Sequence, residues 1–245
     1  MSRFFIPKES VRGKIILITG KEAHHILDVL RLGVLDKIVA FDGSGKEYVG
    51  FIKDTKRGVL SVEIVETRTP SGPGASRITL IQALPKKEKM DYIIEKSTEL
   101  GVHSIVPVIT ERTIPRWDAP KKAAQGQRWM KIAKEASKQC GRVDIPKIER
   151  IMTFSEEMAK GAADYDLALI AALTDEAIRL KEALSGFKGG KAAIAIGPEG
   201  DFTPREIRQA REAGFKSINL GPRVLKSDTA GLATLAILNY ELSNS

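Results

Sequence analysis

The sequence predicts an α/β protein that carries a second, β-rich part at its N-terminus. From Arg77 onward, apolar runs of strand length alternate with helical patterns, which is typical of a mostly parallel sheet covered by helices. Residues 1–70 read instead as a series of short strands separated by Gly-containing turns. A breaker-rich stretch, residues 69–76, separates the two patterns. We therefore predict two domains, at residues 1–70 and 77–245, with a linker at residues 71–76.

The N-terminal part contains four strand-like runs and one helical pattern. The runs are rich in β-branched residues, and turn sequences at residues 42–45 (DGSG) and 57–58 (RG) separate the last three of them. A series of short strands of this length tends to close into a barrel. The strands are expected at Ile15–Ile18, Lys37–Phe41, Glu47–Lys53 and Val59–Val65, and the helix at Lys21–Leu30.

The C-terminal part alternates strands with helices. Its last helix is apolar around more than half of its circumference, so we expect it to be buried against the sheet or against a second subunit. The buried stripe of its longest helix is expected to contain Trp129, Ile132, Ala133, Ala136 and Cys140. The strands are expected at Ile78–Leu84, Ser104–Ile109, Leu167–Ala172, Ala192–Ile196 and Ser217–Leu220, and the helices at Lys87–Leu100, Lys121–Cys140, Asp175–Leu184 and Thr229–Leu242.

The last two strands each end in a Gly-Pro pair, Gly197-Pro198 and Gly221-Pro222. A further helix lies between them, since Thr203 and Glu206 are spaced as a capping box around Pro204, and Gly214 follows its end. The order strand, helix, strand predicts that the two strands are parallel neighbours. Both Gly-Pro loops then leave the carboxyl edge of the sheet, where open α/β sheets bind ligands.

These loops suit a flat ligand better than a phosphate group. Gly197, Gly200 and Gly221 allow a backbone to approach a ligand closely, and the prolines stiffen the loops. Neither loop has a GxGxxG or GxxxxGK[ST] motif, which disfavours nucleotide phosphates. The alternative, that Gly-Pro only ends two strands, stays open at this point.

Composition favours a polyanionic partner and a reducing compartment. The chain has 39 Lys and Arg against 31 Asp and Glu, a formal charge of +8, which suits nucleic acid or an acidic membrane surface. Its single cysteine, Cys140, excludes an internal disulfide and is typical of the cytoplasm. No apolar run is long enough for a signal peptide or a membrane span, and no His, Cys and Asp cluster has metal-ligand spacing. We therefore expect a cytoplasmic protein without a metal.

Two motifs in the Gly-Pro region resemble those of a known family. Residues 196–207 (IGPEGDFTPREI) and 220–230 (LGPRVLKSDTA) are similar to the signature loops of the RsmE family of ribosomal RNA methyltransferases, in the SPOUT class. The family usually has glycine, arginine and glutamate where this chain has Asp201, Lys226 and Asp228. Shorter similarities cover the rest of the chain, at residues 3–7 (RFFIP), 24–31 (HHILDVLR), 41–45 (FDGSG), 86–102 (KKEKMDYIIEKSTELGV), 111–113 (ERT) and 137–142 (SKQCGR).

This resemblance implies a fold that periodicity alone does not. The family combines an N-terminal PUA-like, RNA-binding β-barrel with a C-terminal SPOUT α/β domain that contains a trefoil knot and forms homodimers. Periodicity alone predicts an unknotted, doubly wound sheet, because knots are very rare. The resemblance also implies the activity: methyl transfer from S-adenosyl-L-methionine to N3 of a uridine in 16S rRNA, either free or in the assembling small ribosomal subunit.

Site residues follow from the loops and from the resemblance. Arg223 and Glu199 are the candidate catalytic residues: Glu199 or Asp228 would accept the N3 proton, and Arg223 would stabilise negative charge or bind a phosphate or the cofactor. An ion pair between the loops that only rigidifies the site is the alternative. Candidate cofactor-binding residues are Leu169, Ile170, Ala171, Ile196, Gly197, Pro198, Glu199, Gly200, Leu220, Gly221, Arg223, Val224, Leu225 and Thr229. Candidate RNA-binding residues are Arg3, Arg31, Arg112, Lys131, Lys134, Lys138 and Arg142.

Two other functions remain open from the sequence. One is a related knotted enzyme with another RNA target, for example a ribose 2′-oxygen. The other is a non-catalytic, RNA-binding ribosome-assembly factor that has kept the fold.

Overall fold

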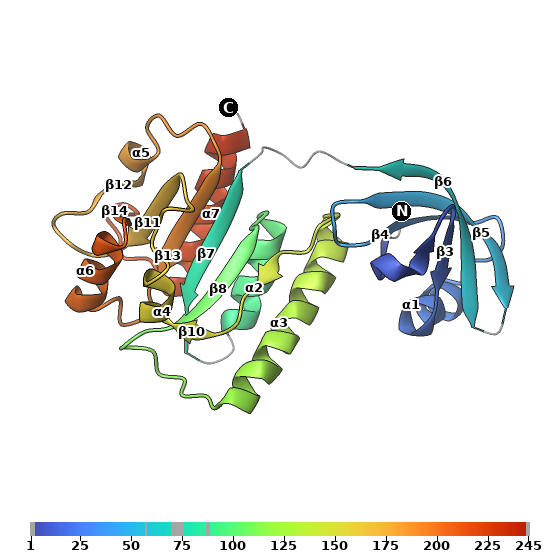
Figure 1. The fold of residues 1–245 in the computed structure, drawn as a ribbon, viewed down its shortest axis with the longest axis horizontal. Coiled ribbons are helices and arrows are strands. Elements are labelled where there is room, and N and C mark those ends of the chain that lie inside the picture. Colours follow the sequence, from blue (N-terminus) through green and yellow to red (C-terminus); the bar gives the residue numbers. More distant parts are fainter. Residues whose placement is uncertain (1–2, 57, 70–75, 87–88, 244–245) are drawn as a thin grey trace. The chain divides into compact units, whose positions relative to one another are not determined.

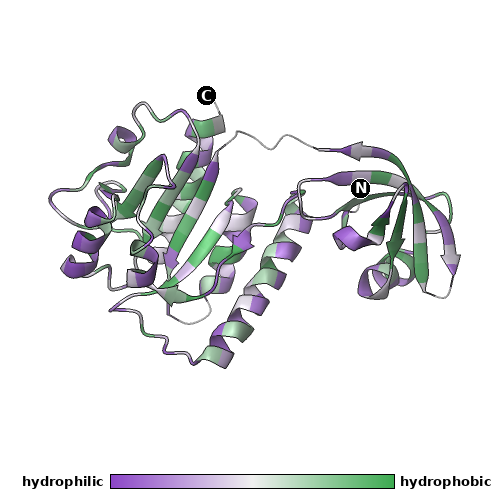
Figure 2. Cartoon of the chain, in the orientation of Figure 1, coloured by the Kyte–Doolittle hydropathy of each residue, from purple (hydrophilic) through white to green (hydrophobic). Residues whose placement is uncertain are grey.

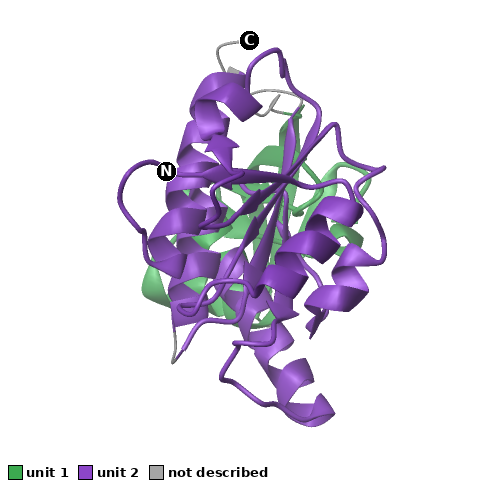
Figure 3. Ribbon diagram, turned by 90° about the vertical axis from the view of Figure 1, so that its left-hand side faces the viewer, with its two compact units in different colours: residues 1–71, 134–145 green, residues 72–133, 146–245 purple. Residues whose placement is uncertain are grey.

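The computed structural model describes residues 3–56, 58–69, 76–86 and 89–243. The chain forms two compact units, which Figure 3 colours separately: residues 1–71 with 134–145, and residues 72–133 with 146–245. The sequence had placed residues 134–145 with the C-terminal part. Residues 71–75 of the predicted linker lie outside the described residues. The domain boundaries at residues 70 and 77 therefore stay a prediction.

The first unit is built on a six-stranded sheet with the order β1-β4-β5-β6-β3-β2 (Figure 1). Strand β1 is parallel to β4, and the other neighbours are antiparallel. All four predicted strands are present, and β5 and β6 are longer than predicted. The elements are β1 (Arg3–Phe5), a 3-10 turn η1 (Lys8–Ser10), β2 (Val11–Arg12), β3 (Ile15–Ile18), β4 (Lys37–Phe41), β5 (Glu47–Lys56) and β6 (Val59–Arg68). The two- and three-residue strands β2 and β1 are too short to give a periodic sequence signal.

The predicted helix of this unit is divided into two different helical turns. An α-helical turn, α1 (Gly20–His24), continues as a π-helical turn, η2 (His25–Val29). The wider turn is closed by the bond from the Leu30 N–H to the His25 carbonyl. Ala23 and Ile26 still face the core of the sheet and are buried, so the predicted apolar face is correct although the helix type is not.

The turn after β4 is held by the carboxylate of Asp42. This carboxylate accepts hydrogen bonds from the Ser44 N–H (2.9 Å), the Ser44 hydroxyl (2.7 Å) and the Tyr48 hydroxyl (2.9 Å). Burial pushes the pKa of Asp42 up, but the bonds from Ser44 and Tyr48 outweigh it, so the pKa lies below its ordinary value. Burial and the bond to Asp42 raise the pKa of Tyr48 to about 12.

We expect Asp42→Asn to lower the free energy of unfolding at neutral pH by about 1.5–3 kcal/mol, the usual range for hydrogen bonds to a charged group. Because the folded-state pKa of Asp42 is depressed, its contribution is present above the unfolded pKa and is lost as the pH falls through the folded pKa. Urea unfolding of both proteins across a pH series checks this. The difference between them should shrink in acid, and a difference independent of pH would contradict it.

The second unit is built on a parallel sheet with the order β10-β8-β7-β13-β11-β14-β12, in which β9 pairs with β8. Its strands are β7 (Arg77–Ala83), β8 (Ser104–Ile109), β9 (Lys147–Ile148), β10 (Met152–Thr153), β11 (Leu167–Ala171), β12 (Ile178–Arg179), β13 (Lys191–Ile196) and β14 (Lys216–Asn219). The helices are α2 (Lys89–Glu99), α3 (Ala119–Cys140), α4 (Phe154–Met158), α5 (Leu180–Ala183), α6 (Pro204–Glu212) and α7 (Ser227–Ser243). The N-terminal part of α3, up to Ala133, belongs to this unit.

The sheet of the second unit is buried on both faces. Figure 2 shows its central strands as apolar and the surrounding helices as polar on one side. Ile81, Ile170 and Ala195 on one face pack with Phe154 and Phe202, whose ring centroids are 4.8 Å apart. Helix α7 packs against α2, β7 and β13, as predicted for a buried final helix. No helix in the described part of the chain is long and apolar enough to cross a membrane.

One prediction about the strand order is wrong. Strands β13 and β14, which carry the two Gly-Pro pairs, are parallel but are not neighbours, because β11 lies between them and pairs with both. The chain passes from β13 through α6 and skips one strand. All three strands point the same way, so both Gly-Pro loops still leave the carboxyl edge, and the end of β11 lies between them.

One local prediction is only partly correct, and another is wrong. Of the predicted helix Asp175–Leu184, only Leu180–Ala183 are helical, as α5, and Ile178–Arg179 form the edge strand β12 instead. Ile178 pairs with Ile218 of β14, and the Asn219 side chain donates to the Ala177 carbonyl (3.0 Å), so pairing with an open strand edge outweighs local helix propensity. Cys140 is exposed, not buried, because it is the last residue of α3 and lies beyond the packed part of the stripe.

Candidate active site

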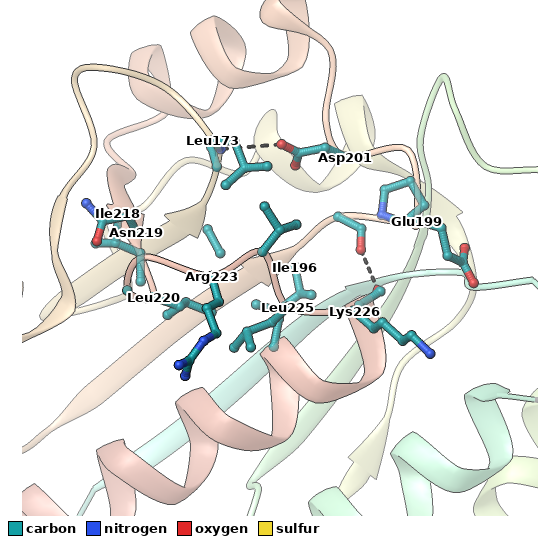
Figure 4. Close-up of a pocket in the computed structure, with 18 residues that line it drawn as sticks. Leu173, Ile196, Glu199, Asp201, Ile218, Asn219, Leu220, Arg223, Leu225 and Lys226 are labelled. Carbon is teal, nitrogen blue, oxygen red and sulfur yellow. Dashed lines mark hydrogen bonds between the residues drawn. The ribbon is translucent and has the colours of Figure 1, made fainter.

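A cavity of about 270 Å³ opens at the carboxyl edge of the parallel sheet of the second unit (Figure 4). Its walls come from three connecting segments: the end of β11 with residues 172–173, the first Gly-Pro loop (residues 197–203), and the second Gly-Pro loop (residues 220–226). The start of α7 closes the fourth side. The lining residues are Ala171, Ala172, Leu173, Ile196, Gly197, Pro198, Glu199, Asp201, Ile218, Asn219, Leu220, Gly221, Arg223, Val224, Leu225, Lys226, Ser227 and Ala230.

The interior of this cavity is apolar and its rim is polar. Ile196, Ile218 and Ala230 are buried side chains, and Leu225 lies close to Ile196 in the centre of the view in Figure 4. Charged groups of Glu199, Asp201, Arg223 and Lys226 belong to the loops around it. An apolar interior with a few polar groups at the rim is typical of sites for small organic ligands.

The first Gly-Pro loop has a left-handed turn at Asp201, where φ is +59°. The Asp201 N–H donates to the Pro198 carbonyl (2.9 Å), and the Asp201 carboxylate accepts from the Leu173 N–H (3.3 Å) and the Phe202 N–H (2.8 Å). Aspartate adopts this conformation more readily than most residues. Asp201, at the position where the resembling family usually has glycine, therefore holds this turn and ties it to the segment after β11.

A buried chain of hydrogen bonds connects β7 to two walls of the cavity, the start of α7 and the first Gly-Pro loop. The Gln82 side-chain amide at the end of β7 donates to the Ser227 hydroxyl (2.9 Å), and that hydroxyl donates to the Gly197 carbonyl. Both side chains are buried. A β-carbon at Gly197 would lie 3.2 Å from the Phe202 nitrogen, so the loop packs tightly against itself at this glycine. This chain fixes the first Gly-Pro loop against the start of α7.

Glu199 is anchored by residues that follow β7. Its carboxylate accepts from the Lys86 N–H (3.1 and 3.2 Å), and the Lys89 ammonium lies 3.5 Å from Glu199 Oε1 and 3.4 Å from Asp228 Oδ1. Lys89 therefore bridges the two carboxylates that the sequence analysis proposed as proton acceptors. The ion pair at Glu199 is made with α2 and not with the second Gly-Pro loop.

Arg223 lies at the other side of the cavity. Figure 4 shows its guanidinium group directed away from Glu199, below Leu220. Within the described residues, no carboxylate forms an ion pair with Arg223, which is exposed. The predicted alternative of an ion pair between Glu199 and Arg223 is therefore wrong, and the guanidinium charge is available for a ligand.

Ten of the fourteen candidate cofactor residues line the cavity. The four that do not are Leu169, Ile170, Gly200 and Thr229. Leu169 and Ile170 are buried within β11, and Thr229 is exposed on α7. The sequence analysis did not select Ala172, Leu173, Asp201, Ile218, Asn219, Lys226, Ser227 or Ala230 for the cofactor site. Most of these residues adjoin selected ones, so extending each segment by one or two positions would have found them.

Most candidate RNA-binding residues make contacts within the protein. The Arg112 guanidinium donates to the Gly200 carbonyl (2.6 Å) and so supports the first Gly-Pro loop. In the first unit, Arg3 pairs with Glu47, Lys138 lies 2.6 Å from Glu22, and Arg142 lies 2.6 Å from Asp144. These ion pairs already engage the three cationic groups, and RNA contact by these residues stays a prediction.

The other three candidates differ in exposure. Lys134 lies 3.6 Å above the ring centroid of Phe5, and burial lowers the pKa of its ammonium group. Arg31 and Lys131 are exposed. Their contact with RNA also stays a prediction.

Comparisons with known proteins identify the family. Residues 73–239 match the family model of an RNA methyltransferase domain, and residues 18–65 match that of an RNA methyltransferase PUA domain. The chain is 30% identical over 252 residues to the ribosomal RNA small subunit methyltransferase E of Bacillus subtilis (strain 168), covering 98% of this chain and 97% of that protein.

Two solved structures agree with this assignment. The ribosomal RNA small subunit methyltransferase E of Neisseria gonorrhoeae, bound to S-adenosyl methionine, is 32% identical with a TM-score of 0.86, over 98% of this chain and 97% of that one. A Legionella pneumophila structure in complex with the bound cofactor SAM is 31% identical with a TM-score of 0.85, over 97% of this chain and 96% of that one. The chain therefore belongs to the RNA methyltransferase family, in the group of the ribosomal RNA small subunit methyltransferases E, as its resemblance to the RsmE family indicated.

Proposed function

We propose that this protein methylates N3 of a specific uridine in 16S ribosomal RNA, with S-adenosyl-L-methionine as the methyl donor. The observation that carries the proposal is the cavity between the two Gly-Pro loops, in a chain whose relatives are named as small-subunit rRNA methyltransferases. Two of the similar solved structures hold S-adenosyl methionine.

The residues of the cavity fit this donor. A cavity of about 270 Å³ lies close to the lower end of the range for small-molecule sites. Its apolar interior at Ile196, Ile218 and Leu225 suits an adenine ring, and the backbone groups of the two loops supply hydrogen bonds to the ring edge. Carboxylates of Glu199 and Asp201 at the rim suit the donor's positive charges.

The bound donor supplies an electrophilic methyl carbon, which N3 of the uracil attacks as the bond from carbon to sulfur breaks. The protein must hold the uracil in line with that carbon, which is chiefly a problem of orientation. It must also take up the N3 proton, because protonated N3 has no free electron pair for the attack. Finally, negative charge that develops on the uracil oxygens needs a positive partner.

Three side chains are placed for these tasks. We propose that the exposed guanidinium of Arg223 stabilises the negative charge or holds the nucleotide phosphate. Glu199 and Asp228 share Lys89, and we propose that one of these two carboxylates accepts the N3 proton. Lys89 then compensates the charge that remains on the other carboxylate.

The two units are assigned different tasks. We propose that the first unit, which contains the PUA domain match, binds RNA, and that the second carries out methyl transfer. The trefoil knot stays a prediction of the resemblance, as does the cytoplasm as the place of action. The assembling small subunit is the proposed natural substrate.

We also propose a homodimer through α7. Ile237 and Tyr240 lie one turn apart on this helix, so they share a face, and their side chains are 43% and 70% exposed. Large apolar side chains on one exposed helix face are typical of a subunit interface. Sedimentation of the full chain and of Ile237→Asp tests this: the variant should sediment as a monomer.

Nucleoside analysis of 16S rRNA from a strain that lacks this gene tests the proposed function. N3-methyluridine should be absent from that rRNA and should return when small subunits from the strain are incubated with purified protein and S-adenosyl-L-methionine. If N3-methyluridine persists and a ribose-methylated nucleoside is lost, the protein has another RNA target. Loss of neither nucleoside, with no binding of the donor, would favour an assembly factor.

A further inference from the structure

The second unit has another cavity, which the methyl-donor site does not use. It has a volume of about 520 Å³ and lies between the end of β7, helix α2, the loop after β8 and the start of α3. Its lining residues are Lys86, Met90, Asp91, Ile114, Pro115, Trp117, Lys121, Gln125, Arg128 and Trp129. The volume is within the range for small-molecule sites.

Two tryptophans, the only two of the chain, form the aromatic wall of this cavity. Trp129 is fully buried, and its indole N–H donates to Asp91 Oδ1 (3.1 Å), so its position is fixed. Trp117 is partly exposed, with its ring centroid 6.0 Å from that of Trp129. The buried tryptophan therefore supports a second aromatic ring that a ligand can reach.

The charged groups of the cavity favour an anion. Lys86, Lys121 and Arg128 all belong to its lining, and the Lys121 ammonium lies 5.9 Å from the Trp117 ring centroid. Asp91 is the single acidic residue of the lining, and it is already bonded to Arg128 (2.5 and 2.9 Å) and to Trp129. An aromatic ring beside lysines is the arrangement that binds the base and the phosphate of a single-stranded nucleotide.

This cavity adjoins the proposed methyl-donor site through one residue. Lys86 lines the second cavity, and its backbone N–H bonds the carboxylate of Glu199, which lines the first. The second cavity therefore lies beside the proposed site of methyl transfer.

We propose that this cavity holds one unstacked nucleotide of the RNA substrate, next to the methylated uridine. The base stacks on Trp117, and the phosphate is bound by Lys121 and Lys86. This inference rests on the proposed function, because it names the subsite that positions the RNA for methyl transfer. Trp117 is thus a positioning residue that acts through the adjacent nucleotide.

Steady-state kinetics with small subunits that lack the modification test the inference. Trp117→Ala should raise KM for subunits about tenfold, the scale of one base–aromatic stack, with kcat and the Kd for S-adenosyl-L-methionine within twofold of wild type. Trp117→Phe should restore most of the loss. Met130→Ala, which removes a large side chain of α3 outside the cavity, is the matched control and should leave KM unchanged. A KM for Trp117→Ala within twofold of wild type would overturn the proposal.

A second variant keeps the test decisive if Trp117→Ala is unstable. Lys121 is exposed, so Lys121→Ala should fold, raise KM severalfold and reduce the salt dependence of RNA binding by about one phosphate contact. An unchanged salt slope would contradict the phosphate role of Lys121.

Tryptophan fluorescence separates this inference from the proposed function. A short oligouridylate should quench the emission of the wild-type protein and not that of Trp117→Phe, whose remaining tryptophan is buried. If wild type does not methylate the subunits but shows this quenching, the methylation assignment fails and the nucleotide site stands. If RNA binds, as measured by its anisotropy, without quenching, the nucleotide site is wrong whatever the activity.

Discussion

Replacing Arg223 by alanine is expected to reduce the rate of methyl transfer by about 10²–10³-fold, the usual loss when one group that stabilises transition-state charge is removed. Arg223 is exposed and makes no ion pair with the described residues, so the folded state should lose less than about 0.5 kcal/mol of stability. Single-turnover methylation of small subunits lacking the modification, with thermal unfolding in parallel, measures both quantities.

Arg208 provides the matched control for Arg223. It is an exposed arginine on α6 that does not line the cavity, so Arg208→Ala should methylate at close to the wild-type rate. Near-normal turnover of Arg223→Ala would remove Arg223 from the catalytic residues. Equal losses in both variants would show that overall charge, and not the position of Arg223, matters.

Ser227→Val should weaken binding of S-adenosyl-L-methionine by more than tenfold. The substitution removes the hydroxyl that connects Gln82 to the Gly197 carbonyl, and so releases the first Gly-Pro loop from α7. It also leaves a buried amide and a buried carbonyl with fewer partners, at a cost of about 1–3 kcal/mol in the free energy of unfolding. Calorimetric titration with the donor and urea unfolding give the two values.

Thr234→Val is the control for the loss of a buried hydroxyl from α7. The Thr234 hydroxyl donates only one turn back, to the Ala230 carbonyl (2.8 Å), and does not reach the loops. This variant should bind the donor as wild type does. If Ser227→Val also binds with unchanged affinity, the buried chain is a stabilising feature only and does not shape the cofactor site.

The sequence was sufficient for elements with strong local signals. The capping box at Thr203 and Glu206 is present, with the Thr203 hydroxyl accepting from the Glu206 N–H and the Glu206 carboxylate accepting in return. Strands β3, β4 and β8 have the predicted bounds. Gly-Pro pairs at two strand ends were enough to place two loops at one edge, because that inference needs only strand direction.

Features that depend on contacts between residues far apart in the sequence could not be predicted from local sequence patterns. The insertion of β11 between β13 and β14 reflects pairing across the whole sheet, which periodicity does not report. The contact of Lys89 with Glu199 and Asp228 joins residues more than a hundred positions apart, so no local sequence pattern favours it over a pair with Arg223. The role of Asp201 depends on a positive φ and on the Leu173 N–H, neither of which its residue type alone predicts.

Hydrogen exchange of the full chain with and without saturating S-adenosyl-L-methionine tests the central claim most directly. Bound donor should slow the exchange of backbone amides in residues 196–201 and 219–226, the segments that enclose the cavity, far more than elsewhere in the second unit. Binding that is measurable by calorimetry but leaves the exchange of both segments unchanged would contradict the account.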